Sequence, residues 1–317
     1  MMLTMTSVGA LSGCADAEAV PGEKGYASGS RDGGHERPGD DASDGETSED
    51  PGEDVGDGDS DVDSDAGGGG GGGGEPKLKP KCVQKDSQVI VIGDSYINWP
   101  SHTFPDDIAR ESGQKWRMQA IGGMSMATGG IGAPLGQYIP SQFDDAIAAD
   151  PDAHTVLMDG GGNDVLVGWL ADPNIEQCKD TGSSKLPRCQ QVITDAIAAA
   201  EQLMEHMLQA GIRDVVYFFY PHIPEGRPIG GPHPNEILDF ALPQVQDFCE
   251  GREAATSGAL RCHFIDMRPV FVGHDPDWFN TDIHPTSDGS KAMAKEVWSR
   301  MTDWCVGQKS GSDCCEP

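Results

Sequence analysis

The chain has 317 residues, of which 37% are apolar, and a formal net charge of −30 at pH 7. This length allows one or two domains. So large an excess of Asp and Glu argues against nucleic acid as a partner, because phosphate backbones are bound by clustered Lys and Arg.

The chain begins with a mildly apolar stretch, residues 1–11, that is too short to span a bilayer. The sequence Leu11-Ser12-Gly13-Cys14 resembles the lipobox of bacterial lipoproteins, whose cysteine is lipidated and becomes the new N-terminus. No Lys or Arg precedes it, so the positively charged start of a signal peptide is missing. The alternative is an ordinary disordered N-terminus with an unrelated cysteine. We interpret residues 1–14 as a signal peptide with a lipobox and predict that Cys14 carries lipid.

Residues 15–81 contain almost no large apolar side chains and include eight consecutive glycines at 67–74. Such a segment cannot bury enough surface to offset its chain entropy. We expect a disordered acidic tether, extended by the repulsion between its carboxylates. A calcium-binding loop at residues 57–65 is disfavoured, because the glycine expected at the sixth position and the glutamate expected at the twelfth are not in place.

Eight cysteines follow the tether, without the CxxC spacing of zinc sites. An even number of this kind predicts disulfides formed in an oxidising compartment, hence a secreted or cell-surface protein. Cys178 and Cys189 bracket one loop, and Cys249 and Cys262 bracket another, so each pair is a plausible local bridge. By elimination, Cys82 and Cys305 would join Cys314 and Cys315, which ties both ends of the domain, and which of them joins which is left open.

Strand and helix signals alternate along residues 82–317. Short apolar runs predict strands at 89–92, 116–121, 155–158, 215–220 and 260–265. Apolar residues at helical spacing predict helices at 104–112, 192–210, 235–248 and 287–304. Alternation of this kind favours a parallel sheet with helices on both faces. We therefore expect one three-layer α/β/α domain over residues 82–317.

Ser95 follows the first predicted strand in the sequence Gly93-Asp94-Ser95. In open α/β sheets ligands bind at the carboxyl ends of the strands, so a hydroxyl group there is a candidate nucleophile. The alternative is a serine that caps a helix.

Three further motifs follow in order: Ala120-Ile121-Gly122-Gly123, Gly161-Gly162-Asn163-Asp164 and Asp282-Ile283-His284-Pro285. With Gly93-Asp94-Ser95 they resemble the four blocks of the SGNH hydrolases, the GDSL-type esterase/lipase family, which supply Ser, Gly, Asn and His in this order. The resemblance runs from about residue 88 to the end of the last helix. It implies a flavodoxin-like fold and acyl transfer from an ester. Taken singly, the last three motifs could instead be turns or a helix start.

The resemblance also implies the roles of these residues. Ser95 would attack the ester and His284 would act as general base. The oxyanion would be held by the backbone N–H groups of Ser95 and Gly123 and by the side-chain amide of Asn163. No cofactor and no metal is predicted.

The supporting acid departs from the family pattern. The family usually places an aspartate three residues before the histidine, where this chain has Thr281. Asp282 lies two residues before His284, and in an extended segment residues i and i+2 point to the same side. We predict Asp282 as the acid, with Thr281, a backbone carbonyl, or the carboxylates of Asp275 and Asp277 as alternatives.

Other residues are weaker candidates for the site. Ser125 lies in Gly123-Met124-Ser125-Met126-Ala127, which approximates the Gly-x-Ser-x-Gly nucleophile elbow, but its last position is Ala and no suitable Asp and His follow. Residues 221–234 follow a strand and could line the pocket. Four histidines have no ligand spacing and are interpreted as structural or surface residues: His222, His233, His263 and His274.

These inferences predict a secreted, surface-tethered serine esterase that acts on carboxylic esters of small molecules, glycans or lipids. We expect a monomer that meets a membrane only through Cys14. The alternative is a non-catalytic glycan-binding module on the same fold. The presence of Ser95, Gly123, Asn163 and His284 together favours the enzyme.

Overall fold

The computed structural model describes residues 82–100, 103–127 and 137–315. The predicted lipid site Cys14 and the tether at 15–81 lie outside these residues, so both stay predictions. Within the described ranges, no helix combines the length and the apolarity that crossing a membrane requires.

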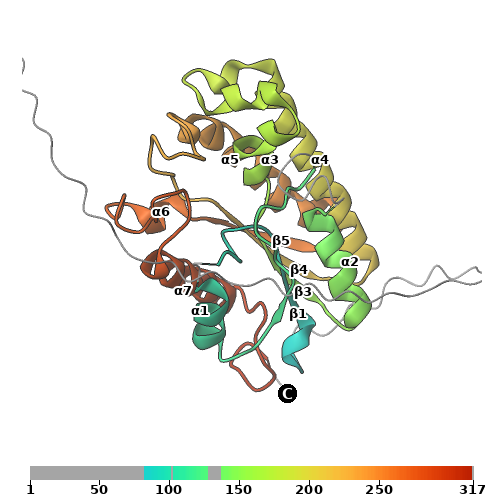
Figure 1. Ribbon diagram of the computed structural model, residues 1–317. Helices are drawn as coiled ribbons and strands as arrows, with labels where there is room; N and C mark the ends of the chain where they lie inside the picture. The colour runs from blue at the N-terminus through green and yellow to red at the C-terminus, as the bar shows by residue number, and fades with distance from the viewer. Residues whose placement is uncertain (1–81, 101–102, 128–136, 316–317) are drawn as a thin grey trace, which may run out of the picture. The chain divides into compact units, whose positions relative to one another are not determined.

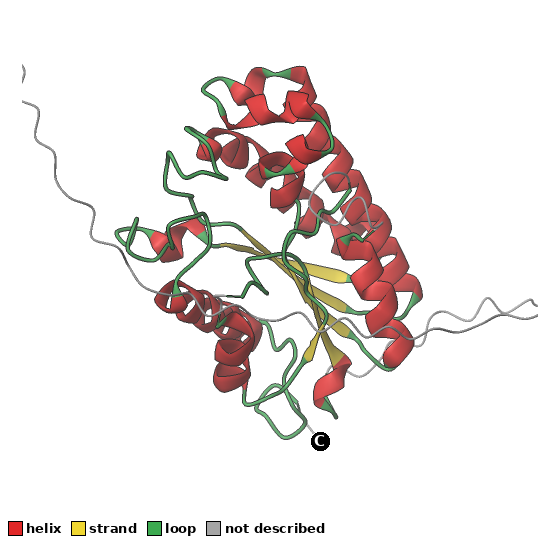
Figure 2. Cartoon of the chain, viewed as in Figure 1, coloured by secondary structure: helices red, strands yellow, loops and turns green. Residues whose placement is uncertain are grey.

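A parallel five-stranded sheet forms the centre of the domain (Figure 2). Its strands are β1 (Val89–Ile92), β2 (Arg117–Met118), β3 (Thr155–Met158), β4 (Asp214–Phe219) and β5 (Arg261–Asp266). β1, β3 and β4 are buried along their whole length, as parallel strands covered on both faces should be. The strand order β2-β1-β3-β4-β5 is that of flavodoxin-like folds, so this expectation is confirmed.

Helices cover both faces of the sheet (Figure 1). On one face, helices α1 (Phe104–Ser112) and α7 (Ser287–Asp303) pack against each other. The other face carries α2 (Ile139–Ala149), α4 (Pro187–Gln209) and α5 (Pro234–Ala255). Two short helices, α3 (Gly162–Leu166) and α6 (Arg268–Phe271), follow β3 and β5. The three-layer α/β/α architecture predicted from the sequence is therefore confirmed.

Short 3₁₀ turns complete the secondary structure. One precedes β1, and three lie between α3 and α4: Asp86–Gln88, Gly168–Leu170, Pro173–Lys179 and Ser183–Lys185. The longest helix, α4, packs on the sheet through an apolar stripe at helical spacing that includes Val192, Ala196, Ala200, Leu203 and Met207.

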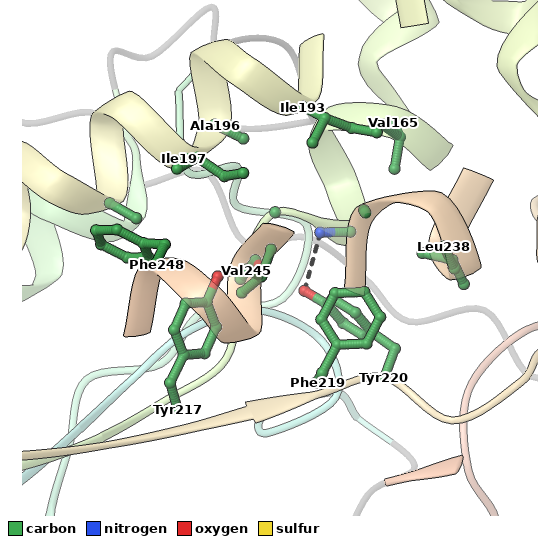
Figure 3. A pocket seen from close by; sticks show the side chains of 15 residues that line it. Val165, Ile193, Ala196, Ile197, Tyr217, Phe219, Tyr220, Leu238, Val245 and Phe248 are labelled. Atoms are coloured by element: carbon green, nitrogen blue, oxygen red, sulfur yellow. Dashed lines mark hydrogen bonds between the residues drawn. The ribbon is translucent and has the colours of Figure 1, made fainter. Parts of the chain in front are cut away.

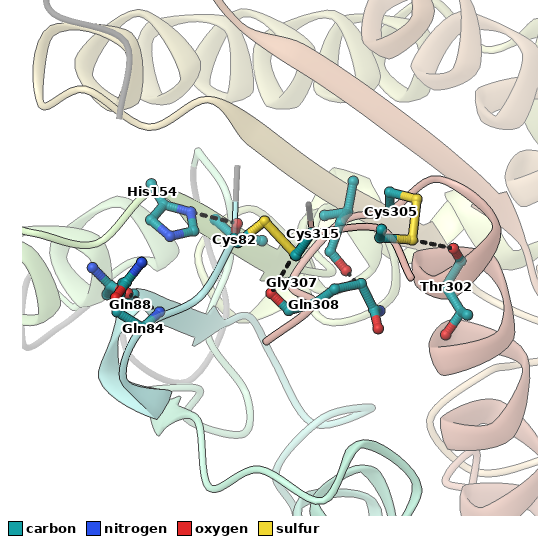
Figure 4. Close-up of a disulfide and its surroundings, with 12 residues drawn as sticks. Cys82, Gln84, Gln88, His154, Thr302, Cys305, Gly307, Gln308 and Cys315 are labelled. Atoms are coloured by element: carbon teal, nitrogen blue, oxygen red, sulfur yellow. Dashed lines mark hydrogen bonds between the residues drawn. A yellow bond between two sulfur atoms is a disulfide. The ribbon is translucent and has the colours of Figure 1, made fainter. Parts of the chain in front are cut away.

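Four disulfides join the eight cysteines of the described chain. Both local bridges are confirmed, Cys178–Cys189 and Cys249–Cys262. The pairing that the sequence left open is Cys82–Cys315 and Cys305–Cys314. The Cys82–Cys315 bridge joins the start of the described chain to its end, with the two Cα atoms 5.8 Å apart (Figure 4). Beside it, Val83 donates a backbone hydrogen bond of 2.7 Å to Gln308.

Candidate active site

The predicted site residues gather at the carboxyl edge of the sheet. The strand order reverses between β1 and β3, and in open α/β sheets ligands bind outside the carboxyl ends of the strands at such a point. Ser95 follows β1, and Asn163 lies in α3, just after β3. The topology alone therefore places these two side chains beside the position where a ligand is expected.

Ser95 lies in a tight turn, residues 93–98, which we call the nucleophile turn. Its backbone is closed by hydrogen bonds from the N–H groups of Ile97 and Asn98 to the carbonyl of Asp94, at 3.2 and 3.0 Å. The side chain of Asp94 also accepts from the N–H of Tyr96 at 3.0 Å, as aspartates in turns commonly do. Ser95 is 3% exposed. The turn therefore holds the serine in one backbone conformation.

Position 93 requires glycine because the side chain of Asp159 approaches its backbone closely. Its φ is +140°, and a Cβ atom built on it would lie 1.8 Å from Oδ1 of Asp159. Its N–H and its carbonyl are both bound by the side-chain amide of Gln142, at 2.7 and 2.9 Å. Any side chain here would push β1 and the end of β3 apart.

Three N–H groups that the sequence assigns to an oxyanion site are free of protein acceptors. Within the described residues, the backbone N–H groups of Ser95 and Gly123 donate no hydrogen bond to the protein. The side-chain Nδ2 of Asn163 donates to the carbonyl of Met124 at 2.9 Å, which fixes the amide and leaves its second N–H for another acceptor. This arrangement can stabilise an oxyanion.

Asp164 fixes the loop that carries Gly123. Its buried carboxylate accepts hydrogen bonds from the N–H groups of Met126 and Ala127, at 2.7 and 2.9 Å. Together with the Asn163 contact, this ties the loop after β2 to α3.

The structure places Asp282 beside the ring of His284. Nδ1 of His284 lies 2.9 Å from Oδ2 of Asp282, and the backbone N–H of His284 donates to Oδ1 at 2.8 Å. The His284 side chain is 3% exposed and that of Asp282 is 32% exposed. The alternatives Thr281, Asp275 and Asp277 are all exposed. Because Nδ1 faces the carboxylate, Nε2 is the nitrogen left to accept a proton from a nucleophile.

Trp99, which sequence reasoning missed, covers the face of His284. The two rings are stacked, with centroids 4.4 Å apart and an angle of 14° between their planes. A Cβ on Gly122 would lie 2.5 Å from Cε3 of Trp99, so the glycine before Gly123 allows this ring to approach. The available signal was an aromatic residue four positions after Ser95.

A buried carboxyl pair, Asp94 and Asp159, lies next to Ser95 and was also missed. Asp94 donates its backbone N–H to Oδ1 of Asp159 at 2.7 Å, and both side chains are fully buried. Burial raises the pKa of Asp159 well above its usual range, and the charge of Asp94 raises it further. Burial also raises the pKa of Asp94, while hydrogen bonds from Asp159, Tyr220 and Tyr96 favour its charged form. Within the pair, these effects favour the proton on Asp159 and the charge on Asp94.

The residues that the sequence disfavoured as site residues make other contacts. Ser125 is buried, and its hydroxyl has no hydrogen-bond partner within the described residues. Each set-aside histidine contacts a different neighbour: His222 with Asp239, His233 with Glu225, His263 with Asp214 and Trp304, and His274 with Trp278. The loop at 221–234 is held by Lys179, whose Nζ donates to the carbonyl of Ile229 at 3.2 Å.

An apolar cavity of about 30 Å³ lies behind the glycines that precede Asn163 (Figure 3). It is enclosed by α4, α5, the end of β4 and residues 160–162. Tyr220 forms one wall, and neither Ser95 nor His284 lines it. Its volume is enough for water.

Comparison with known proteins shows the family of the chain. The family model of the GDSL-like lipase/acylhydrolase family matches residues 91–292, which include all the predicted site residues of the domain. No curated protein matches.

Solved structures similar to this chain share little sequence with it. They include a family two carbohydrate esterase from Clostridium thermocellum (14% identity, TM-score 0.47, 70% of this chain and 64% of that chain). They also include an aryl esterase of M. smegmatis (13% identity, TM-score 0.44, 70% of this chain and 99% of that chain). A third is a carbohydrate acetylesterase from Sinorhizobium meliloti (11% identity, TM-score 0.46, 68% of this chain and 98% of that chain). This chain thus spans less than two thirds of the length of the Clostridium thermocellum esterase.

Proposed function

The chain belongs to the GDSL-like lipase/acylhydrolase family, and on that premise we propose that it is a serine esterase that hydrolyses carboxylic esters. Ser95 is the nucleophile, His284 the general base and Asp282 the supporting acid. The observation that carries the proposal is the 2.9 Å contact between Asp282 and Nδ1 of His284, beside the nucleophile turn.

In the proposed reaction, Oγ of Ser95 attacks the ester carbonyl carbon while Nε2 of His284 takes the hydroxyl proton. The oxyanion that forms accepts hydrogen bonds from Ser95 N–H, Gly123 N–H and the free N–H of Asn163. The intermediate then collapses: the bond to the alcohol breaks, and the alcohol leaves with the proton from His284. A water molecule, deprotonated by His284, finally attacks the acyl-serine. The bond from the acyl carbon to Oγ breaks, Oγ takes the proton back from His284, and the carboxylic acid leaves.

Asp282 supports this cycle through charge and orientation. Its two oxygens contact the ring Nδ1 and the backbone N–H of the same residue, which favours the tautomer that carries its proton on Nδ1. A carboxylate there stabilises the imidazolium that forms when His284 is protonated. The substrates we propose are acyl or acetyl esters of small molecules, glycans or lipids.

The test is turnover of p-nitrophenyl acetate, with labelling by a fluorophosphonate probe. We expect the wild type to hydrolyse the ester and to be labelled, and Ser95→Ala to do neither. Ser125→Ala is the matched control and should keep both properties. Loss of labelling in Ser125→Ala with retention in Ser95→Ala would show that the nucleophile is assigned wrongly. Glycan binding without labelling of the wild type would instead support a non-catalytic module.

We also propose that the protein is secreted and held at a membrane surface by lipid on Cys14, with residues 15–81 as the spacer. The four disulfides of the described chain support an oxidising compartment. In cell fractionation, the wild type should sediment with membranes and Cys14→Ala should be soluble. Equal solubility of the two would rule the anchor out.

A further inference from the structure

Two buried tyrosines, Tyr96 and Tyr220, flank the nucleophile turn but have no part in the reaction steps above. Their rings meet edge to face, with centroids 4.9 Å apart and planes at 83°. Tyr96 follows Ser95 in the chain, and Tyr220 follows the last residue of β4. Both are at most 2% exposed, so neither hydroxyl has water as its normal partner.

The hydroxyl of Tyr220 joins the nucleophile turn to α3. It donates to Oδ2 of Asp94 at 2.6 Å and accepts from the backbone N–H of Gly162 at 3.0 Å (Figure 3). Gly162 precedes Asn163, whose amide belongs to the proposed oxyanion site. A shift of this hydroxyl would therefore move Asn163 relative to Ser95.

The hydroxyl of Tyr96 joins the nucleophile turn to the segment that carries the base. It donates to the carbonyl of Ile283 at 2.7 Å, and Ile283 precedes His284. The backbone N–H of the same tyrosine donates to Oδ1 of Asp94. Asp94 therefore binds both tyrosines, one through each carboxylate oxygen.

We propose that Tyr96 and Tyr220 are positioning residues. The hydroxyl of Tyr96 holds the segment of His284, and the hydroxyl of Tyr220, bound to Asp94 and Gly162, holds Asn163, each at a fixed distance from Ser95. This inference rests on the proposed function, because it concerns the same three groups. Neither tyrosine contacts the reacting atoms in the steps above. A misplacement of about 1 Å at a reacting centre can cost about 100-fold in rate, so loss of either hydroxyl should affect kcat more than substrate binding.

The experiment compares Tyr96→Phe, Tyr220→Phe and Tyr217→Phe, each of which removes one buried hydroxyl and keeps the ring. Tyr217 is the matched control because it is equally buried and its hydroxyl also binds backbone, donating to the carbonyl of Gly160 at 2.8 Å, but it does not bind Asp94. For each variant, kcat and KM on p-nitrophenyl acetate, the rate of fluorophosphonate labelling and the Tm are measured. Circular dichroism confirms that the compared samples are folded.

We expect kcat and the labelling rate to fall about 10- to 100-fold in Tyr96→Phe and Tyr220→Phe, with KM within about threefold of the wild type. Tyr217→Phe should keep kcat within about twofold despite a lowered Tm. The proposal is overturned if the first two variants keep the wild-type kcat, or if Tyr217→Phe loses as much. Should Tyr220→Phe not fold, Tyr96→Phe decides by the same criteria. A wild type that neither turns over nor labels refutes the proposed function, and this proposal with it.

Discussion

His284 depends on two side chains that contact its ring. Asp282 binds Nδ1, and the indole of Trp99 covers one face. In the proposed reaction, the first contact sets the tautomer, and the second places an electron-rich surface against a ring that becomes positively charged. Both contacts are stronger for the imidazolium than for the neutral ring, so both should contribute to the rate.

Asp282→Asn should lower kcat by up to about 10⁴-fold, because the amide can bind Nδ1 but carries no charge and can favour the wrong tautomer. Steady-state kinetics on p-nitrophenyl acetate measures this. Thr281→Val, Asp275→Asn and Asp277→Asn are the controls and should change kcat little. An Asp282→Asn enzyme within about threefold of the wild type would show that another group supports the histidine.

Trp99→Leu should lower kcat about tenfold, since a cation–π contact in a desolvated site is worth about 1 to 2 kcal/mol. Trp99→Phe keeps an aromatic face and should recover most of that loss. Trp304→Leu is the control: Trp304 also stacks on a histidine, His263, at 4.8 Å, but away from the proposed site residues. Equal kcat values for Trp99→Leu and Trp99→Phe would argue against the electrostatic role.

The secondary structure was predictable where sequence pattern and burial coincide. β1, β3 and α1 have the predicted bounds. A short β-branched run fits only a strand, and a clear apolar stripe at helical spacing fits only a helix. β2 is shorter than predicted, since it is an edge strand that pairs only with β1. α2 was missed although Ile139, Phe143 and Ala146 form its buried stripe. α5 extends past its predicted end at residue 248 to Ala255, and Pro243 lies inside it, as the predicted range 235–248 also implied.

Only the local parts of the candidate site could be predicted from the sequence. The motifs identified Ser95 and Asn163, because each motif is local in the sequence. Asp159 and Tyr220 each follow a buried strand, but their link to Asp94 depends on which strands become neighbours. Sequence separation hides such links, which arise only when the ends of β1, β3 and β4 meet.

The buried carboxyl pair joins the ends of β1 and β3 and should make stability depend on pH. Asp159 has a folded-state pKa raised above the unfolded value of about 3.8, so only the unfolded chain releases this proton as pH rises above about 4. The free energy of unfolding therefore falls as pH rises from about 4 toward the folded-state pKa of Asp159. The slope is at most about 1.4 kcal/mol per pH unit.

Asp159→Asn should remove this slope, because asparagine resembles the protonated acid and cannot ionise. Its Oδ1 can still accept from the N–H of Asp94. Urea unfolding between pH 5 and 9 measures the difference, with the exposed Asp106→Asn as control. Identical pH dependence in Asp159→Asn and the wild type would mean that Asp159 is not the protonated partner.

At the scale of the whole molecule, the Cys82–Cys315 bridge closes by far the longest loop, with a sequence separation of 233 against 11 for Cys178–Cys189. In the chain-entropy model, closing these loops stabilises the fold by about 5 and about 3 kcal/mol. Replacing Cys82 and Cys315 by Ser should therefore cost more stability in urea than replacing Cys178 and Cys189. The reverse order would show that the loop around Cys178–Cys189 contributes more than its length suggests.

The same bridge determines how the domain would respond to mechanical force. A pull applied to the chain before Cys82 and after Cys315 passes directly from one cysteine to the other, because their sulfur atoms are covalently joined. All the strands and helices of the described residues lie between the two cysteines, so none of them would carry the load. When the domain is stretched by its two ends, it should therefore stay folded as long as the bridge is intact. After a reductant breaks the bridge, the same force would act on the strands and helices and could unfold them.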